Sequence, residues 1–142
     1  MREILPGMLW LGNAADARDV ESILQAGIVA VMELAIEQPV QPFPRSMVYC
    51  RFPILDGQQG SQEVLRAAIE TLISLLKEKI RTLVYCGAGM SRSPAVIAGA
   101  LSILHGGSPD ERLRQIVSGY PHDVSPQLWR DIREICAQMK QT

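Results

Sequence analysis

A cysteine and an arginine stand six positions apart on either side of a run of small or uncharged residues. Cys86 opens the segment, Arg92 closes it, and between them lie Gly87, Ala88, Gly89, Met90 and Ser91. A loop of small residues can curl so that successive backbone N–H groups converge on one point, which binds an anion without any net charge. Ser93-Pro94 is expected to open a helix, whose free N–H groups and dipole add to this field. The segment therefore predicts an anion site with a thiol at its base.

The residue types at the two ends of this loop suit phosphoryl transfer. An unperturbed thiol is mostly protonated at neutral pH, but the surrounding N–H groups favour the thiolate of Cys86, which is the nucleophilic form. Arg92 can hold two phosphate oxygens at once and stabilise charge on the transferred group. Ser93 adds a hydroxyl that could reach the sulfur. The alternative, a core cysteine before a tight turn, would need this spacing to be a coincidence.

The elements that must position this loop follow from hydrophobic periodicity. Strand-like runs are Ile4–Leu11, Ile28–Leu34, Met47–Phe52 and Thr82–Tyr85. Helical patterns cover residues 16–26, 62–79 and 93–105, and two more helices are expected to start after Ser108 and Ser125. This order predicts an α/β fold with a central sheet flanked by helices. Sites in such sheets lie beyond the carboxyl ends of strands, which is where the loop after Tyr85 stands.

Length and charge narrow the classes of function. The 142 residues fit one domain, 1–142, and fourteen basic against fifteen acidic residues give a net charge of −1. No domain-wide basic field is present for nucleic acid or an anionic membrane. The apolar runs are too short to span a bilayer, and the N-terminus does not resemble a signal peptide, so we expect a cytoplasmic protein. Three cysteines without a CxxC pair predict neither a disulfide framework nor a zinc site.

The segment CGAGMSRSP (86–94) resembles the C-x5-R phosphate loop of cysteine-based protein tyrosine phosphatases, and the dual-specificity branch most. LWLGNAADARD (9–19) and AGIVAVMEL (26–34) are similar to the opening strand, helix and second strand of that branch, and FPILDGQ (52–58) to its general-acid segment. The resemblance implies a mixed, mostly parallel sheet of about five strands and a phosphocysteine intermediate. It implies no metal and no organic cofactor. The expected partner is a phosphorylated protein or a small phosphomonoester, bound by a chain that we expect to be monomeric.

A second catalytic group is needed, because the leaving oxygen requires a proton and the attacking water a base. Asp56 is the candidate that matches the family's placement, thirty positions before Cys86. The alternative is that Asp56-Gly57 is only a turn. Asp123, near the end of a loop, is the reserve, whereas Asp110 at a helix start and Asp131 on a helix face are poorer choices.

Two residues depart from the family pattern. Tyr85 stands where the family usually has a histidine that orders the loop and favours the thiolate, and Glu33 stands where the branch usually has asparagine. Tyrosine cannot carry positive charge, although its hydroxyl can donate a hydrogen bond. We therefore expect slower activity at acidic pH than in the family.

Tyr85 also keeps a second function open, a phospho-binding module with weak or no turnover. Sulfur transfer and arsenate reduction fit less well, because related thiolate loops for those reactions differ in length or in cysteine placement. Cys50 is expected to be a core residue of a strand, and a reversible disulfide with Cys86 is its alternative role.

Overall fold

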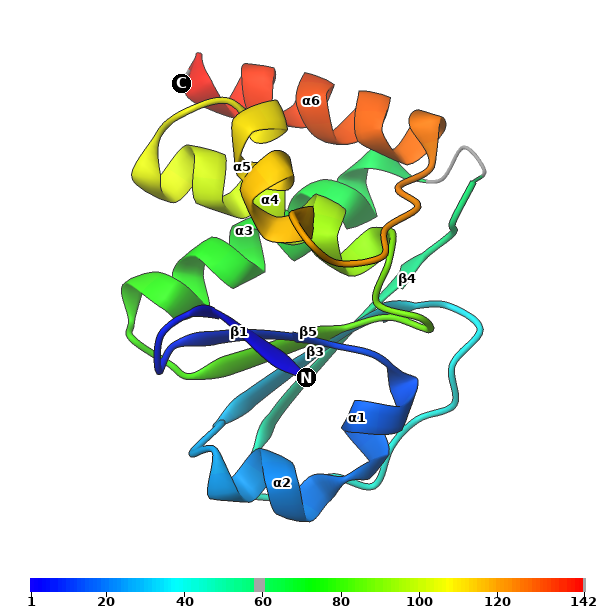
Figure 1. Cartoon of the computed structure of the whole chain (residues 1–142), viewed down its shortest axis with the longest axis vertical. Helices are drawn as coiled ribbons and strands as arrows, with labels where there is room; N and C mark the ends of the chain where they lie inside the picture. Colours follow the sequence, from blue (N-terminus) through cyan, green and yellow to red (C-terminus); the bar gives the residue numbers. More distant parts are fainter. Residues whose placement is uncertain (58–60, 142) are drawn as a thin grey trace.

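The computed structural model of the chain describes residues 1–57 and 61–141. One five-stranded sheet crosses the molecule in the order β1-β2-β5-β3-β4. Neighbouring strands are parallel except for β1 and β2, which are antiparallel. Helices α3–α6 cover one face of the sheet and α1 and α2 lie on the other (Figure 1). The α/β architecture with a mixed, mostly parallel sheet is as predicted.

The strands differ from the sequence prediction at the N-terminus. They are β1 (Arg2–Leu5), β2 (Leu9–Gly12), β3 (Ala30–Ala35), β4 (Val48–Ile54) and β5 (Thr82–Tyr85). The prediction of one strand over Ile4–Leu11 is wrong, because Pro6-Gly7 turns the chain back on itself. Gly7 has a φ of 67°, and the N–H of Met8 donates to the carbonyl of Leu5 at 3.0 Å. This hairpin supplies the fifth strand.

The first predicted helix is also two elements rather than one. The helices are α1 (Ala14–Arg18), α2 (Val20–Gln25), α3 (Gln62–Lys77), α4 (Arg92–His105), α5 (Pro109–Val117) and α6 (Pro126–Lys140). Asn13 and Asp16 form a reciprocal capping box at the start of α1. Asp19 then accepts from the N–H of Ser22 and caps α2 separately. A second cap so soon after the first ends α1 and restarts the chain as α2.

The centre of the fold is β5 together with α4. All four residues of β5 are buried, and α4 is buried from Arg92 to Ser102 between the sheet and the helices α3 and α6. Gly99 allows the close approach of α6, since a Cβ there would lie 3.1 Å from Ile132 and 3.2 Å from the sulfur of Cys136. The loop between β5 and α4 is thus held at both ends by the most buried elements. No helix within residues 1–57 and 61–141 is both long and apolar enough to cross a membrane.

Candidate active site

The loop 86–91 leaves the carboxyl end of β5 and enters α4 at Arg92, where the sequence placed it. Contacts with the end of β2 and the start of α1 fix its shape. The N–H of Ala14 donates to the carbonyl of Gly87 at 2.9 Å. Gly89 has a φ of 74°, and a Cβ there would lie 2.9 Å from the carbonyl oxygen of Gly12. Only glycine meets both demands, because other residues resist positive φ and none could avoid the contact.

Cys86 and Ser93 lie at the base of this loop. Cys86 is 2% exposed, and Ser93 is fully buried where α4 begins. The Ser93 hydroxyl has no hydrogen-bond partner among the described residues, so the expected bond to the Cys86 sulfur is not formed. A buried hydroxyl without a partner is unusual and costly.

Arg92 is anchored at one end of its guanidinium and open along the other edge. Its Nη1 donates to the Ile54 carbonyl at 3.0 Å and to the Glu37 carboxylate, whose nearer oxygen is 2.6 Å away. Its Nε is buried and unpaired among the described residues, and its Nη2 would lie 3.7 Å from a Cβ on Gly87. The Nε–Nη2 edge therefore remains available beside the loop, in the fork geometry that takes two oxygens of one anion.

Glu37 was not identified from the sequence. It belongs to the loop between β3 and β4, 55 positions before Arg92, and its side chain is half-exposed. The only signal was an acidic residue at the start of a proline-rich loop, which is commonplace. Because it contacts Arg92 directly, it joins the site as a positioning residue.

Asp56 lies at the end of the loop 86–91 and contacts its last residue. Its Oδ1 accepts from the Ser91 hydroxyl at 2.7 Å, and the Ser91 Oγ accepts in turn from the Ser125 N–H at 3.2 Å. The N–H of Gly57 donates to the Ser125 hydroxyl at 3.2 Å. One carboxylate oxygen is held while Oδ2 has no hydrogen bond within the described part of the chain. Gln58, the last residue of the segment compared with the general-acid region, lies outside the described residues.

The other three aspartates occupy different settings. Asp110 accepts from the indole N–H of Trp129 at 2.8 Å, and Asp131 is buried on α6 and accepts from Gln127. Asp123 meets the loop through its backbone, whose N–H donates to the Met90 carbonyl at 2.8 Å. Asp56 is thus the one of the four whose carboxylate contacts the loop.

Tyr85 and Glu33, the two residues that depart from the family pattern, are hydrogen-bonded to each other. The side chain of Glu33 is 1% exposed. In the sheet, Glu33 stands opposite Tyr85 on β5 and Arg51 on β4, so the three residues lie in one row across the strands. Its Oε2 accepts from the Tyr85 hydroxyl at 3.1 Å, from the Tyr49 hydroxyl and from Arg51 Nε at 3.0 Å. Burial, reinforced by Glu33, raises the pKa of Tyr85 and of Tyr49 above the usual range for a phenol. Both hydroxyls therefore stay protonated and donate to the carboxylate.

A disulfide between Cys50 and Cys86 does not fit this sheet. Cys50 on β4 is paired with Met32 on β3, and Met32 with Val84 on β5. Two strand spacings amount to about 10 Å, whereas the Cα atoms of a disulfide lie within about 7 Å. Burial also raises the pKa of the Cys50 and Cys136 thiols, which makes them poor nucleophiles at neutral pH. Within residues 1–57 and 61–141, no three His, Cys, Asp or Glu side chains are grouped as a metal site would need.

Comparison with known proteins places the chain in one family. No family model matches. The Arabidopsis thaliana protein-tyrosine-phosphatase IBR5 is 31% identical over 133 residues, 93% of this chain but only about half (49%) of that protein. Mouse dual specificity phosphatase 28 is 30% identical over 117 residues, 80% of this chain and 69% of the relative. The crystal structure of human DUSP28 superposes with a TM-score of 0.86 at 23% identity over the full length of both chains. The chain therefore belongs to the dual-specificity phosphatases, a family of protein phosphatases.

Proposed function

We propose that this chain hydrolyses phosphomonoesters on proteins through a phosphocysteine intermediate, with phosphotyrosine as a substrate and phosphoserine or phosphothreonine where the pocket admits them. The observation that carries the proposal is the hydrogen bonding of the Arg92 guanidinium. Its Nη1 is fixed by Glu37 and Ile54, and its buried Nε lacks a partner beside a loop shaped for an anion. A phosphate on that edge would supply the missing acceptors.

The first chemical step uses Cys86 and Asp56. The Cys86 thiolate attacks phosphorus while the bond from phosphorus to the leaving oxygen breaks, and Asp56 gives its proton to that oxygen. The loop N–H groups and the Nε–Nη2 edge of Arg92 hold the three remaining phosphoryl oxygens. The products are the dephosphorylated alcohol and a phosphocysteine.

The second step returns the enzyme to its starting state. A water molecule attacks phosphorus, Asp56 takes its proton, and the bond between sulfur and phosphorus breaks to release phosphate and the thiolate. The unpaired Ser93 hydroxyl is assigned to the sulfur that leaves, since a thiolate at that position would accept its hydrogen bond.

The test is phosphate release from an aryl phosphate and from a phosphotyrosine peptide, with a chelator present. We expect turnover that vanadate inhibits and that Cys86→Ser abolishes. Cys50→Ser is the matched control, because it removes a thiol two strands away and should leave turnover intact. Mass spectrometry of acid-quenched enzyme should find the added phosphoryl group on Cys86. Turnover that survives in Cys86→Ser would refute the thiolate mechanism.

A second candidate is a phospho-binding module, and the Tyr85–Glu33 pair favours it. In this pair an uncharged tyrosine stands where the family usually has a histidine, and the buried Glu33 carboxylate accepts its hydrogen bond from the neighbouring strand. A module of this kind would bind the phosphotyrosine peptide through the loop and Arg92, and it would hydrolyse neither the peptide nor the aryl phosphate. Peptide binding to the wild type without phosphate release would select this candidate.

A further inference from the structure

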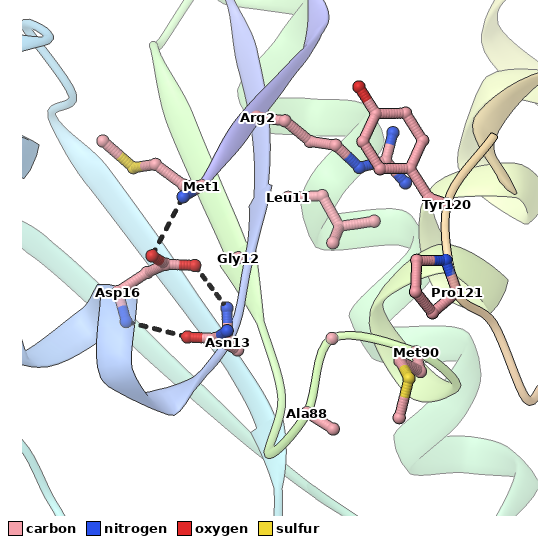
Figure 2. A pocket seen from close by; sticks show the side chains of 11 residues that line it. Met1, Arg2, Leu11, Gly12, Asn13, Asp16, Ala88, Met90, Tyr120 and Pro121 are labelled. Carbon is pink, nitrogen blue, oxygen red and sulfur yellow. Dashed lines mark hydrogen bonds and ion pairs between the residues drawn. The ribbon is translucent and has the colours of Figure 1, made fainter. Parts of the chain in front are cut away.

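A cavity opens beside the loop 86–91. It has a volume of about 330 Å³. Ala88, Gly89 and Met90 form the part of its lining that belongs to the loop, and the rest comes from Met1, β1, the end of β2, the start of α1 and the segment before α6. Figure 2 shows Arg2, Leu11, Tyr120 and Pro121 around the same space. The substrate mechanism above makes no use of this cavity.

Arg2 gives the cavity one uncompensated charge. Its guanidinium lies over the Tyr120 ring, 3.7 Å from the ring centroid (Figure 2), and it forms no ion pair with a carboxylate of the described residues. The cavity's acidic side chain is already engaged, since Asp16 accepts from the Asn13 N–H and from the Met1 amine, each at 2.9 Å. Partial burial lowers the pKa of Arg2, which reflects lost hydration that a bound anion would replace.

We propose that this cavity binds an acidic side chain of the peptide substrate, a few residues from the phosphorylated one. The proposal rests on the proposed function and deepens it. A single guanidinium matches the single charge of a carboxylate, whereas a second phosphate would bring nearly two charges to one cation. The remaining lining, including Leu11, Met90 and Pro121, suits the methylene groups of a glutamate.

The cavity adjoins the loop, since Ala88, Gly89 and Met90 line it, so a few residues of peptide can span the distance between them. Successive residues of an extended peptide advance by about 3.3–3.6 Å each. We place the peptide so that, with its phosphate on the loop 86–91, the neighbouring residues run across Ala88, Gly89 and Met90 into the cavity. Tyr120 lines the same cavity as Arg2, and the cation–π contact with its ring restricts the Arg2 side chain there.

The experiment compares phosphotyrosine peptides that carry one glutamate at each of the three positions on either side, with glutamine at the same position as reference. At one position, the wild type should show a kcat/KM about 3- to 10-fold higher for glutamate, the usual worth of a partly buried ion pair. Arg2→Gln should bring this ratio to one. Arg45→Gln, an exposed arginine before the amino end of β4, is the matched control and should keep the ratio. A bisphosphorylated peptide preferred over the glutamate peptide would overturn the carboxylate assignment.

Two further measurements separate the outcomes. Hydrolysis of a small aryl phosphate reports the catalytic machinery of every variant, so hydrolysis of all peptides at equal rates overturns this inference and leaves the proposed function standing. If no substrate is hydrolysed, the dissociation constants of the same peptides on Cys86→Ser supply the glutamate-to-glutamine ratio instead. Should Arg2→Gln fold poorly, Arg2→Glu with lysine peptides inverts the preference, and no inversion in a folded variant contradicts the proposal.

Discussion

The hydroxyl of Tyr85 donates a hydrogen bond of 3.1 Å to the buried carboxylate of Glu33. The residue before the nucleophile and its neighbour on β3 thus form one unit, which Tyr49 and Arg51 complete from β4. Three donors compensate one buried carboxylate, as burial of a charge requires. A change at Tyr85 alters what Glu33 accepts from, which is the basis of the first two predictions.

Tyr85→His should raise the fraction of Cys86 present as thiolate. Glu33 would stabilise an imidazolium at this position, and a positive charge next to the loop favours the nucleophile. We expect the rate of Cys86 alkylation at pH 6 to rise about threefold or more. Tyr49→His is the control, because it offers the same ring to the same carboxylate from β4. Equal alkylation profiles in wild type and Tyr85→His would contradict the prediction.

The phenols of this unit should make the fold sensitive to alkaline pH. Burial raises the pKa of Tyr85 and Tyr49 in the folded chain, whereas the unfolded chain releases these protons above about pH 10. The unfolded state then binds fewer protons, so the free energy of unfolding is unaffected below that pH and falls as pH rises beyond it. The raised pKa values of Cys50 and Cys136 act in the same direction from about pH 8.5.

The measurement is Tm between pH 7 and 11 for the wild type and for Tyr85→Phe. The variant should lose about 1 kcal/mol at pH 7, since Glu33 loses one donor, yet decline less steeply above pH 10. Tyr120→Phe, which removes an exposed phenol, should follow the wild type. Parallel curves for wild type and Tyr85→Phe would disprove the linkage.

Glu37→Gln should weaken catalysis through Arg92. Without the carboxylate, the Ile54 carbonyl is the one firm acceptor that Nη1 keeps among the described residues, and the Nε–Nη2 edge is less well oriented. Because orientation matters most in the transition state, we expect kcat/KM to fall about tenfold, mainly in kcat. Glu63→Gln at the start of α3 is the control. A tighter vanadate complex with unchanged kcat would show instead that Glu37 competes with phosphate.

Gly89→Ala should damage the loop more than a comparable change elsewhere. Any L-residue at a φ of 74° costs about 1 kcal/mol, and here the new Cβ would also lie 2.9 Å from the Gly12 carbonyl oxygen. Gly7→Ala shares the positive φ but has open space around it. Both variants should lose stability, and only Gly89→Ala should lose vanadate affinity. Retained affinity in a folded Gly89→Ala would show that the loop tolerates the shift.

The sequence predicted the parts of the site that are local in the chain. Cys86, Arg92 and the helix after Ser93 follow from one segment, because a strand, a turn of small residues and a helix start are all encoded there. Glu37 and the Tyr49–Glu33 contact escaped prediction, since they depend on how β3, β4 and β5 are set side by side. The predicted first strand and the predicted first helix each proved to be two elements. Pro6-Gly7 divides the strand and Asp19 divides the helix, although the hydrophobic pattern continues across both.

Asp56→Asn should slow turnover by roughly 10²- to 10⁴-fold with a poor leaving group. An amide cannot protonate the leaving oxygen, although it can keep the hydrogen bond from Ser91 and hence the local structure. The loss should shrink for an aryl phosphate with an acidic phenol, because that oxygen leaves without a proton. Asp123→Asn is the control, because the hydrogen bond from Asp123 to the loop comes from its backbone N–H. An equal loss across leaving groups would make Asp56 a structural residue, and a leaving-group-dependent loss in Asp123→Asn would transfer the role of the acid to Asp123.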